Sequence, residues 1–192
     1  MRGSLVLGGF AYHYSDWGWQ VWPGAELGYR LDENLRFFAS VNQAFRVPTY
    51  TELHYISPAN RGNPDLLPEE AWTYEAGLRF DTPRARLDLA LFLRDAEQLI
   101  DWVLNSETEA WQAVNLTEVR MRGLEVSAFW PLCGSRVFGL PLESFSGSYA
   151  WLDAEKDAFS ETSRYALDHL EHKLVFDLRH RWGNSPVRQT WA

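Results

Sequence analysis

The sequence predicts an all-β chain with the strand pattern of an antiparallel transmembrane β-barrel and about eight strands. Three observations lead to this prediction. Apolar and polar residues alternate with a period of two through most of the chain. Short turns and long polar loops connect the alternating segments. Aromatic residues are abundant, with 10 Trp, 8 Tyr and 11 Phe among 192 residues, and many fall near the ends of the expected strands.

The expected strands follow one another along the chain, and no helix is predicted. A strand-like N-terminal segment precedes residues 19–31, where Trp19 and Val21 alternate with Gln20. The pattern resumes at Leu35, after Asp32-Glu33-Asn34. Further strands are expected at residues 72–80, 86–94, 115–130, 142–153 and 168–181. Several of these segments are longer than the roughly 5–6 residues usual for strands in soluble sheets.

The two faces of the expected strands differ in chemistry. Leu87, Leu89, Leu91 and Leu93 share one face, which we expect to contact lipid. Charged residues recur on the other face of successive strands, and we expect them to line a water-filled lumen: Glu26, Arg30, Arg36, Glu75, Arg79, Asp88 and Arg94. Paired carboxylates on a sheet could instead indicate a glycosidase cleft. No acid pair is singled out by its spacing, so we predict no catalytic residue and no enzyme.

The lengths of the connections indicate how the predicted barrel is oriented in the outer membrane. Short turns are expected at 32–34, 81–84 and 183–186, and long loops at 46–70, 104–110 and 154–164. Short periplasmic turns and longer extracellular loops are typical of outer-membrane barrels. The segment 131–141 is longer than a periplasmic turn should be and departs from the pattern.

The composition argues against several functional classes. The net charge of −8 and the pI near 5.1 argue against a nucleic-acid partner. The single cysteine, Cys133, excludes an internal disulfide and a cysteine-based zinc site. His169 and His172 lie three residues apart, which would point them to opposite faces of a strand. We therefore predict no metal site and no cofactor.

The aromatic residues near strand ends have two interpretations. In a soluble β-protein they would form a core or stack on sugars. In a membrane barrel they would form girdles at the depth of the lipid headgroups. The second interpretation explains their positions and is preferred: Trp17, Trp19, Trp72, Tyr74, Trp102, Trp111, Trp130 and Trp151.

Two stretches resemble a known family. "NQAFRVPTYTELHY" (42–55) and "GNPDLLPEEAWTYEAGLRF" (62–80) are similar to the signature of TonB-dependent outer-membrane receptors. In that family a strand ends in Phe-Arg-x-Pro, a long external loop follows, and Asn-Pro-x-Leu-x-Pro-Glu leads back into the barrel. The matching residues are Phe45, Arg46, Pro48, Asn63, Pro64, Leu66, Pro68 and Glu69. "NLTEVRMRGLEVSAFW" (115–130) resembles a later strand, and the likeness is greatest to the vitamin B12 receptor branch.

The resemblance implies a fragment of an active transporter in the bacterial outer membrane. Such a receptor imports a scarce metal chelate, a siderophore or cobalamin, with energy from the TonB complex. The implied partners are outer-membrane lipid, the chelate, and TonB through an N-terminal plug. The plug and the barrel ends are absent, so residues 1–192 are expected to be one partial domain of a barrel of about 22 strands. As an isolated chain it should form an open, curved sheet.

The loop at 46–70 is the predicted ligand-binding region. Pro48 restricts Val47 to extended geometry, and Pro64 and Pro68 stiffen the returning segment. The candidate contacts combine aromatic faces with cationic and hydrogen-bonding groups: Arg46, Tyr50, His54, Tyr55, Asn60 and Arg61. This mixture suits a large, partly anionic chelate. The alternative is that these residues only hold the shape of the loop.

Two other functions remain open at this level. A passive porin would share the alternation but not the loop motif. A soluble carbohydrate-binding protein would be separated from both by its solubility without detergent.

Overall fold

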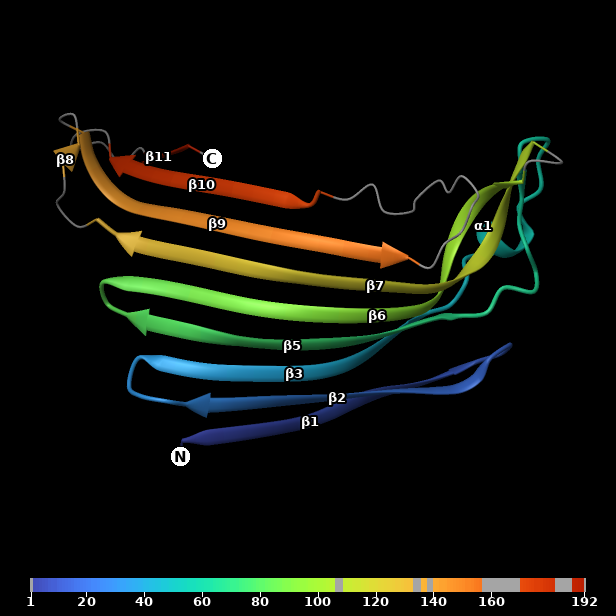
Figure 1. The fold of residues 1–192 in the computed structure, drawn as a ribbon, viewed down its shortest axis with the longest axis horizontal. Coiled ribbons are helices and arrows are strands. Elements are labelled where there is room, and N and C mark those ends of the chain that lie inside the picture. The colour runs from blue at the N-terminus through green and yellow to red at the C-terminus, as the bar shows by residue number, and fades with distance from the viewer. Residues whose placement is uncertain are drawn as a thin grey trace.

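A computed structural model describes residues 2–105, 109–132, 136–137, 140–156, 170–181 and 188–191. Nine strands form one sheet in chain order, β1-β2-β3-β5-β6-β7-β9-β10-β11, and each neighbouring pair is antiparallel (Figure 1). Their bounds are β1 Gly3–Tyr14, β2 Gly18–Arg30, β3 Leu35–Arg46, β5 Glu69–Thr82, β6 Ala85–Asn105, β7 Ala110–Pro131, β9 Leu140–Lys156, β10 His172–Arg181 and β11 Arg188–Trp191. The predicted all-β antiparallel fold is confirmed.

Three short elements and β11 were not expected from the sequence. The one-turn helix α1 (Tyr50–His54) and the two-residue strand β4 (Asn60–Arg61) lie within the predicted loop at 46–70. β8 (Arg136–Val137) pairs with the first residues of β9, so the anomalous segment 131–141 contains a small hairpin. Cys133, much of the predicted loop at 154–164 and the predicted turn at 183–186 lie outside the described residues.

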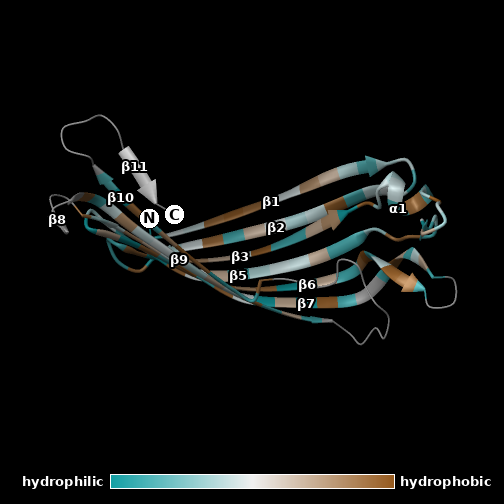
Figure 2. Cartoon of the chain, turned by 90° about the horizontal axis from the view of Figure 1, so that it is seen from above, coloured by the Kyte–Doolittle hydropathy of each residue, from teal (hydrophilic) through white to brown (hydrophobic). Residues whose placement is uncertain are grey.

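The sheet is open and curved, as Figure 2 shows. Among the described residues β1 pairs only with β2, and β11 pairs only with β10. The sheet therefore has two edges and does not close on itself, as the sequence led us to expect for this chain alone. No helix in the described part of the chain is long and apolar enough to cross a membrane.

The strand register aligns apolar residues on one face across the whole sheet. Leu91 lies opposite Ala76 on β5 and Leu124 on β7. Followed in both directions, this row contains Leu5, Leu27, Ala39, Ala76, Leu91, Leu124, Trp151 and His172. Many large apolar side chains on this face are exposed, including Leu91 at 56% and Leu174 at 62%. We call it the apolar face.

The opposite, polar face contains all seven charged residues that the sequence assigned to it. Arg30, Arg36, Arg79 and Asp88 align in a single row across β2, β3, β5 and β6. Arg79 forms an ion pair with Asp88, and Arg86 forms one with Asp81. A hollow of about 710 Å³ lies over this region and is lined largely by side chains of the polar face. The predicted separation of the two faces is confirmed.

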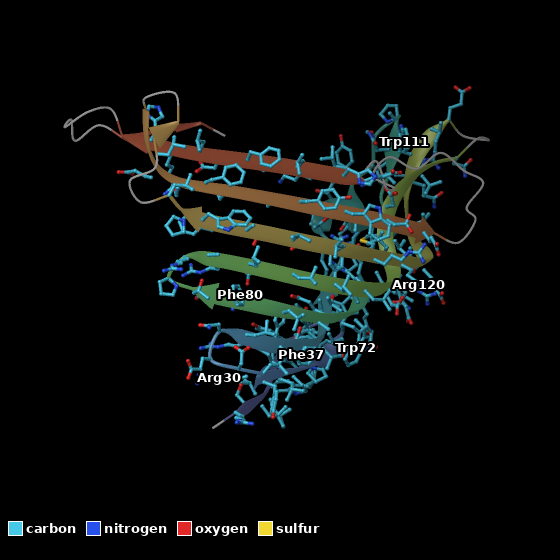
Figure 3. All side chains as sticks on the ribbon, turned by 60° about the vertical axis from the view of Figure 1, so that its left-hand side comes forward. Arg30, Phe37, Trp72, Phe80, Trp111 and Arg120 are labelled. Carbon is cyan, nitrogen blue, oxygen red and sulfur yellow. The ribbon has the colours of Figure 1, made fainter. Side chains whose placement is uncertain are left out.

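The connections between strands lie at two opposite ends of the sheet. The turns after β2 and β5 lie at one end, the turn end, and α1 lies at the other, the loop end (Figure 1). Asp32 stabilises the first turn because its Oδ1 accepts hydrogen bonds from the N–H groups of Asn34 and Leu35. Figure 3 shows Arg30 and Phe80 toward the turn end, and Trp111 and Arg120 toward the loop end.

β6 and β7 extend beyond the sheet at the loop end. They contain 21 and 22 residues, about twice the roughly 9–11 residues that a membrane-spanning strand needs. The hairpin bends away from the sheet at the loop end (Figure 1). We assign the bend to Gln98, whose φ of 57° departs from the extended backbone of a strand. Trp102 is buried beyond this bend and Trp111 packs against the same cluster, so assigning these two residues to an interfacial girdle was wrong.

Candidate functional site

The loop between β3 and β5 begins with a rigid approach to α1. Pro48 is buried, and Thr49 is the N-cap of α1. The Thr49 side chain accepts a hydrogen bond from the Glu52 N–H group, and the Glu52 carboxylate accepts one from the Thr49 N–H group at 2.7 Å. This reciprocal capping box satisfies donors at the start of a helix. It allows a five-residue helix to form where little else would favour one.

Arg46, the last residue of β3, lies between two carboxylates. Its Nε and Nη2 atoms donate to Glu69 at 2.8 and 2.6 Å. Its Nη1 atom donates to both oxygens of Glu52 at 3.1 and 3.0 Å. The two carboxylate side chains are only 14% and 15% exposed. The arginine thus joins the end of β3 to α1 and to the start of β5.

This environment changes the protonation equilibrium of Glu52. Partial burial raises its pKa, but hydrogen bonds from Arg46 and Thr49 lower it by more. The pKa of Glu52 therefore lies below the ordinary value of a glutamate. The carboxylate is ionised at neutral pH and remains available to the arginine.

A small apolar cluster lies between the loop and the bent hairpin. Leu66 is 3% exposed and packs with Ile100, Trp102 and Ala113, which belong to the extensions of β6 and β7. Leu53 of α1 and Trp111 pack against this cluster. The loop and the hairpin therefore share a core of their own at the loop end.

Polar contacts join the same two segments. The Asn115 side chain donates to the carbonyls of Leu67 and Gln98, at 2.9 and 2.7 Å, and accepts from the Leu67 N–H group at 2.9 Å. The Glu69 Oε1 atom also accepts from the Ile100 N–H group at 2.7 Å. β4 adds a short parallel pairing with β7 at Trp111 and Gln112.

Gly62 lies where the returning chain passes closest to α1. A Cβ atom at this position would lie 2.9 Å from backbone atoms of Glu52, Leu53 and His54. Its N–H group donates to the carbonyl of Tyr55 at 2.6 Å. A glycine is therefore needed here because two backbone segments touch.

The motif residues mostly stabilise the loop. Phe45 packs with Trp22 at a ring distance of 4.8 Å. Asn63 donates its N–H group to the carbonyl of Glu52 and accepts from the Asp65 N–H group. Pro68 is half-buried, and Pro64 is exposed. Arg46 and Glu69, one from each half of the motif, form an ion pair.

Four of the other five candidate ligand contacts are exposed, and Asn60 is half-buried. Tyr50 and His54 occupy the first and last positions of α1, with ring centroids 5.0 Å apart. Tyr50 is 80% exposed and Tyr55 is 47% exposed. Asn60 is half-buried and its side chain donates to Ser57 Oγ at 3.3 Å, while Arg61 is exposed. The structure thus brings five of the six candidates onto α1 and the residues that follow it.

Sequence reasoning overlooked Glu52, Thr49 and the hairpin residues Ile100 and Trp102. Thr49 and Glu52 had a readable signal, since Thr-x-x-Glu is the pattern of a capping box. The hairpin residues had none, because their role depends on the bend at Gln98. Among the described residues no group of three His, Cys, Asp or Glu side chains is placed to hold a metal ion.

Comparison with known proteins gives the context of this geometry. The family model of the TonB dependent receptor-like β-barrel matches residues 4–191. A vitamin B12 transporter of Vibrio vulnificus (strain YJ016) is 30% identical over 104 residues, which are 54% of this chain and 16% of the relative. The chain therefore spans only a small part of the length of that curated relative.

Solved structures share the fold at low sequence identity. The siderophore receptor PirA of Pseudomonas aeruginosa superimposes with a TM-score of 0.68 and 19% identity over 99% of this chain and 34% of the receptor. A ferric enterobactin receptor of the same organism, solved with enterobactin, superimposes with a TM-score of 0.68 and 17% identity over 93% of this chain and 28% of the receptor.

The proteins that this chain resembles are transporters and receptors. The family match agrees with the resemblance to TonB-dependent receptors that the loop motif of the sequence indicated. The match also covers nearly the whole chain, and the open sheet agrees with part of such a barrel. The chain belongs to the TonB-dependent receptor family of bacterial outer-membrane β-barrel proteins.

Proposed function

We propose that the chain is part of a receptor that binds a metal chelate at the loop end, for import energised by TonB. Resemblance to a vitamin B12 transporter and to siderophore receptors supports a chelate as the ligand class. We further propose that residues 1–192 form one partial barrel domain, with the plug and the rest of the barrel contributed by sequence outside this range.

The proposal rests on one observation: some large apolar side chains of the loop pack inward, while others are exposed. Leu53 and Leu66 pack inward against the hairpin. Tyr50 and Ile56 are each 80% exposed. Large apolar side chains held exposed on an ordered scaffold are typical of binding surfaces.

The proposed contacts are Tyr50, His54, Tyr55, Asn60 and Arg61. Aromatic faces would cover the apolar parts of a chelate, and Arg61 would meet its oxygens. Arg46 is not among the proposed contacts, because its guanidinium is paired with the carboxylates of Glu52 and Glu69.

Affinity measurements test the proposal in the complete receptor that includes this chain. Arg61→Ala should weaken binding about ten- to a hundredfold, since a hydrogen bond to a charged group contributes roughly 1.5–3 kcal/mol. Tyr50→Ala and Tyr55→Ala should also weaken it. The probes are vitamin B12 and ferric enterobactin, and heat-shifted gel migration confirms folding.

Arg84→Ala at the turn end is the matched control, because Arg84 is exposed but lies far from the loop. It should leave the dissociation constant unchanged. If the parent binds a probe and all three loop variants bind it within twofold of the parent, the loop is scaffold and the contacts lie elsewhere.

A further inference from the structure

Every nitrogen of the Arg46 guanidinium donates to a carboxylate of the protein itself. A guanidinium has five N–H donors, and Arg46 makes five hydrogen bonds to Glu52 and Glu69, with lengths between 2.6 and 3.1 Å. The Arg46 side chain is 41% exposed, but a chelate oxygen there would compete with two carboxylates that are only 14% and 15% exposed. This geometry argues against a direct ligand contact.

Each carboxylate has a second partner in a different element. Glu52 accepts from the Thr49 N–H and hydroxyl groups at 2.7 and 2.9 Å, within the capping box of α1. Glu69 accepts from Ile100 N–H, just beyond the bend of β6. Through these two acids, Arg46 connects β3 to α1, to β5 and to the hairpin.

The helix that receives this support is too short to be stable alone. One helical turn fixes several dihedral angles for very few hydrogen bonds, so isolated short helices do not persist in water. The position of α1 must therefore come from its contacts, which are the Arg46–Glu52 pair, the capping box and the packing of Leu53.

We infer that Arg46 is a positioning residue that fixes α1, so that Tyr50 and His54 are presented to the ligand in one orientation. The role of Arg46 in fixing α1 is argued from the contacts alone. The presentation of Tyr50 and His54 to a ligand rests on the proposed function. It separates the six candidate residues into Arg46, which holds the loop, four exposed residues, and the half-buried Asn60.

The fork shape of arginine makes a conservative substitution diagnostic. Lysine keeps the positive charge but has three donors on a single atom and cannot bind two carboxylates in the same planar manner. Arg46→Lys should therefore release α1 while preserving the charge. Glu52→Gln should do the same while preserving the size of the side chain, and Arg84→Lys is the matched control on an exposed arginine far from the loop.

The experiment measures the mobility of α1 without using a ligand. A nitroxide is attached at the exposed position Thr51 (Thr51→Cys) in the complete receptor, with Cys133→Ser to prevent labelling elsewhere. The spectrum should show an immobilised label in the parent and in Arg84→Lys, and a mobile label in Arg46→Lys and Glu52→Gln. An unchanged spectrum in Arg46→Lys and Glu52→Gln overturns the inference.

Affinity for vitamin B12 and ferric enterobactin, measured on the same variants, separates this inference from the proposed function. A mobile label together with binding weakened about tenfold or more supports both. A mobile label with binding within twofold supports the positioning role and contradicts the use of α1 in binding. Weakened binding with an immobile label would show that Arg46 contacts the ligand and would overturn the inference.

Discussion

Asn115 shows how much of the loop end depends on single side chains. Its amide makes three hydrogen bonds that join the returning loop at Leu67 to the bend at Gln98. Gln98 has a positive φ, which is uncommon for a residue other than glycine. A side chain that binds the Gln98 carbonyl directly stabilises this conformation.

Replacement of Asn115 by alanine should loosen the loop without unfolding the barrel. Each hydrogen bond lost contributes roughly 0.5–1.5 kcal/mol, and the partial exposure of the site favours the lower part of that range. We expect faster proteolytic cleavage within residues 55–67 in the complete receptor. Asn34→Ala at the turn end is the control, and equal cleavage rates for both variants would contradict this role.

Acidification should weaken the Arg46–Glu52 contact. Glu52 has a lowered pKa in the folded protein, so its contribution is fully present above the unfolded-state pKa of glutamate, about 4.3. The contribution is lost as the pH falls through the lower folded-state pKa. The label at position 51 should remain immobile from neutral pH down to the folded-state pKa of Glu52 and become mobile below it. Glu52→Gln should show no such transition, because its label is already mobile at neutral pH.

At the scale of the strands, the register divides the apolar face into a part with apolar side chains alone and a charged margin. Leu89 lies opposite Leu78 and Val126. Leu93 lies opposite Tyr74 and Arg122, and Arg122 pairs with Asp153. The apolar rows therefore end between Leu91 and Leu93 on β6, beside the aromatic residues Tyr74 and Trp151.

Arginine substitutions along β6 should reveal this pattern. Leu89→Arg and Leu91→Arg should each cost ~2–4 kcal/mol of unfolding free energy in lipid vesicles, because they place a charge in hydrocarbon. Ala90→Arg should cost much less, since Ala90 lies on the polar face opposite Glu125. Leu93→Arg should fall between them. Equal costs at positions 89, 90 and 91 would show that the faces are wrongly assigned.

At the scale of the whole molecule, the two ends of the sheet should lie on opposite sides of the outer membrane. The loop end has the long excursions and α1, and the turn end has tight turns at 31–34 and 83–84. Long loops are extracellular in barrels of this kind.

Epitope tags test this orientation in intact cells. A tag beside the exposed Ala59 should bind antibody without permeabilisation, and a tag at the exposed Arg84 should bind only after it. Labelling of the Arg84 tag on intact cells would reverse the orientation.

The sequence predicted the strands well because one physical rule governs all of them. A strand between lipid and a polar lumen must alternate, and a period of two is visible in every such segment. The loop end was predicted less well. Five residues are too few to show helical periodicity, so α1 was missed. Trp102 and Trp111 were assigned to a girdle because nothing in the local pattern announces the bend at Gln98.

The candidate site was predicted in outline. Both halves of the loop motif were recognised, but the pairing of Arg46 with Glu69 depends on strands that meet only in the folded sheet. Arg46 was predicted to contact the ligand because the sequence gives no indication of which carboxylates an arginine at the end of a strand will meet. Exposure of Tyr50 likewise depends on Leu53 turning inward toward a distant hairpin.

The chain-order pairing of the sheet also affects how fast it can fold. Every long strand pairs with its nearest long neighbours in sequence, from β1 to β11. Each new strand therefore adds to an existing hairpin across a connection of limited length, and the entropy lost in closing a loop stays small at every step. Assembly can proceed as a series of local additions, which is the arrangement of contacts associated with faster folding among proteins of similar stability.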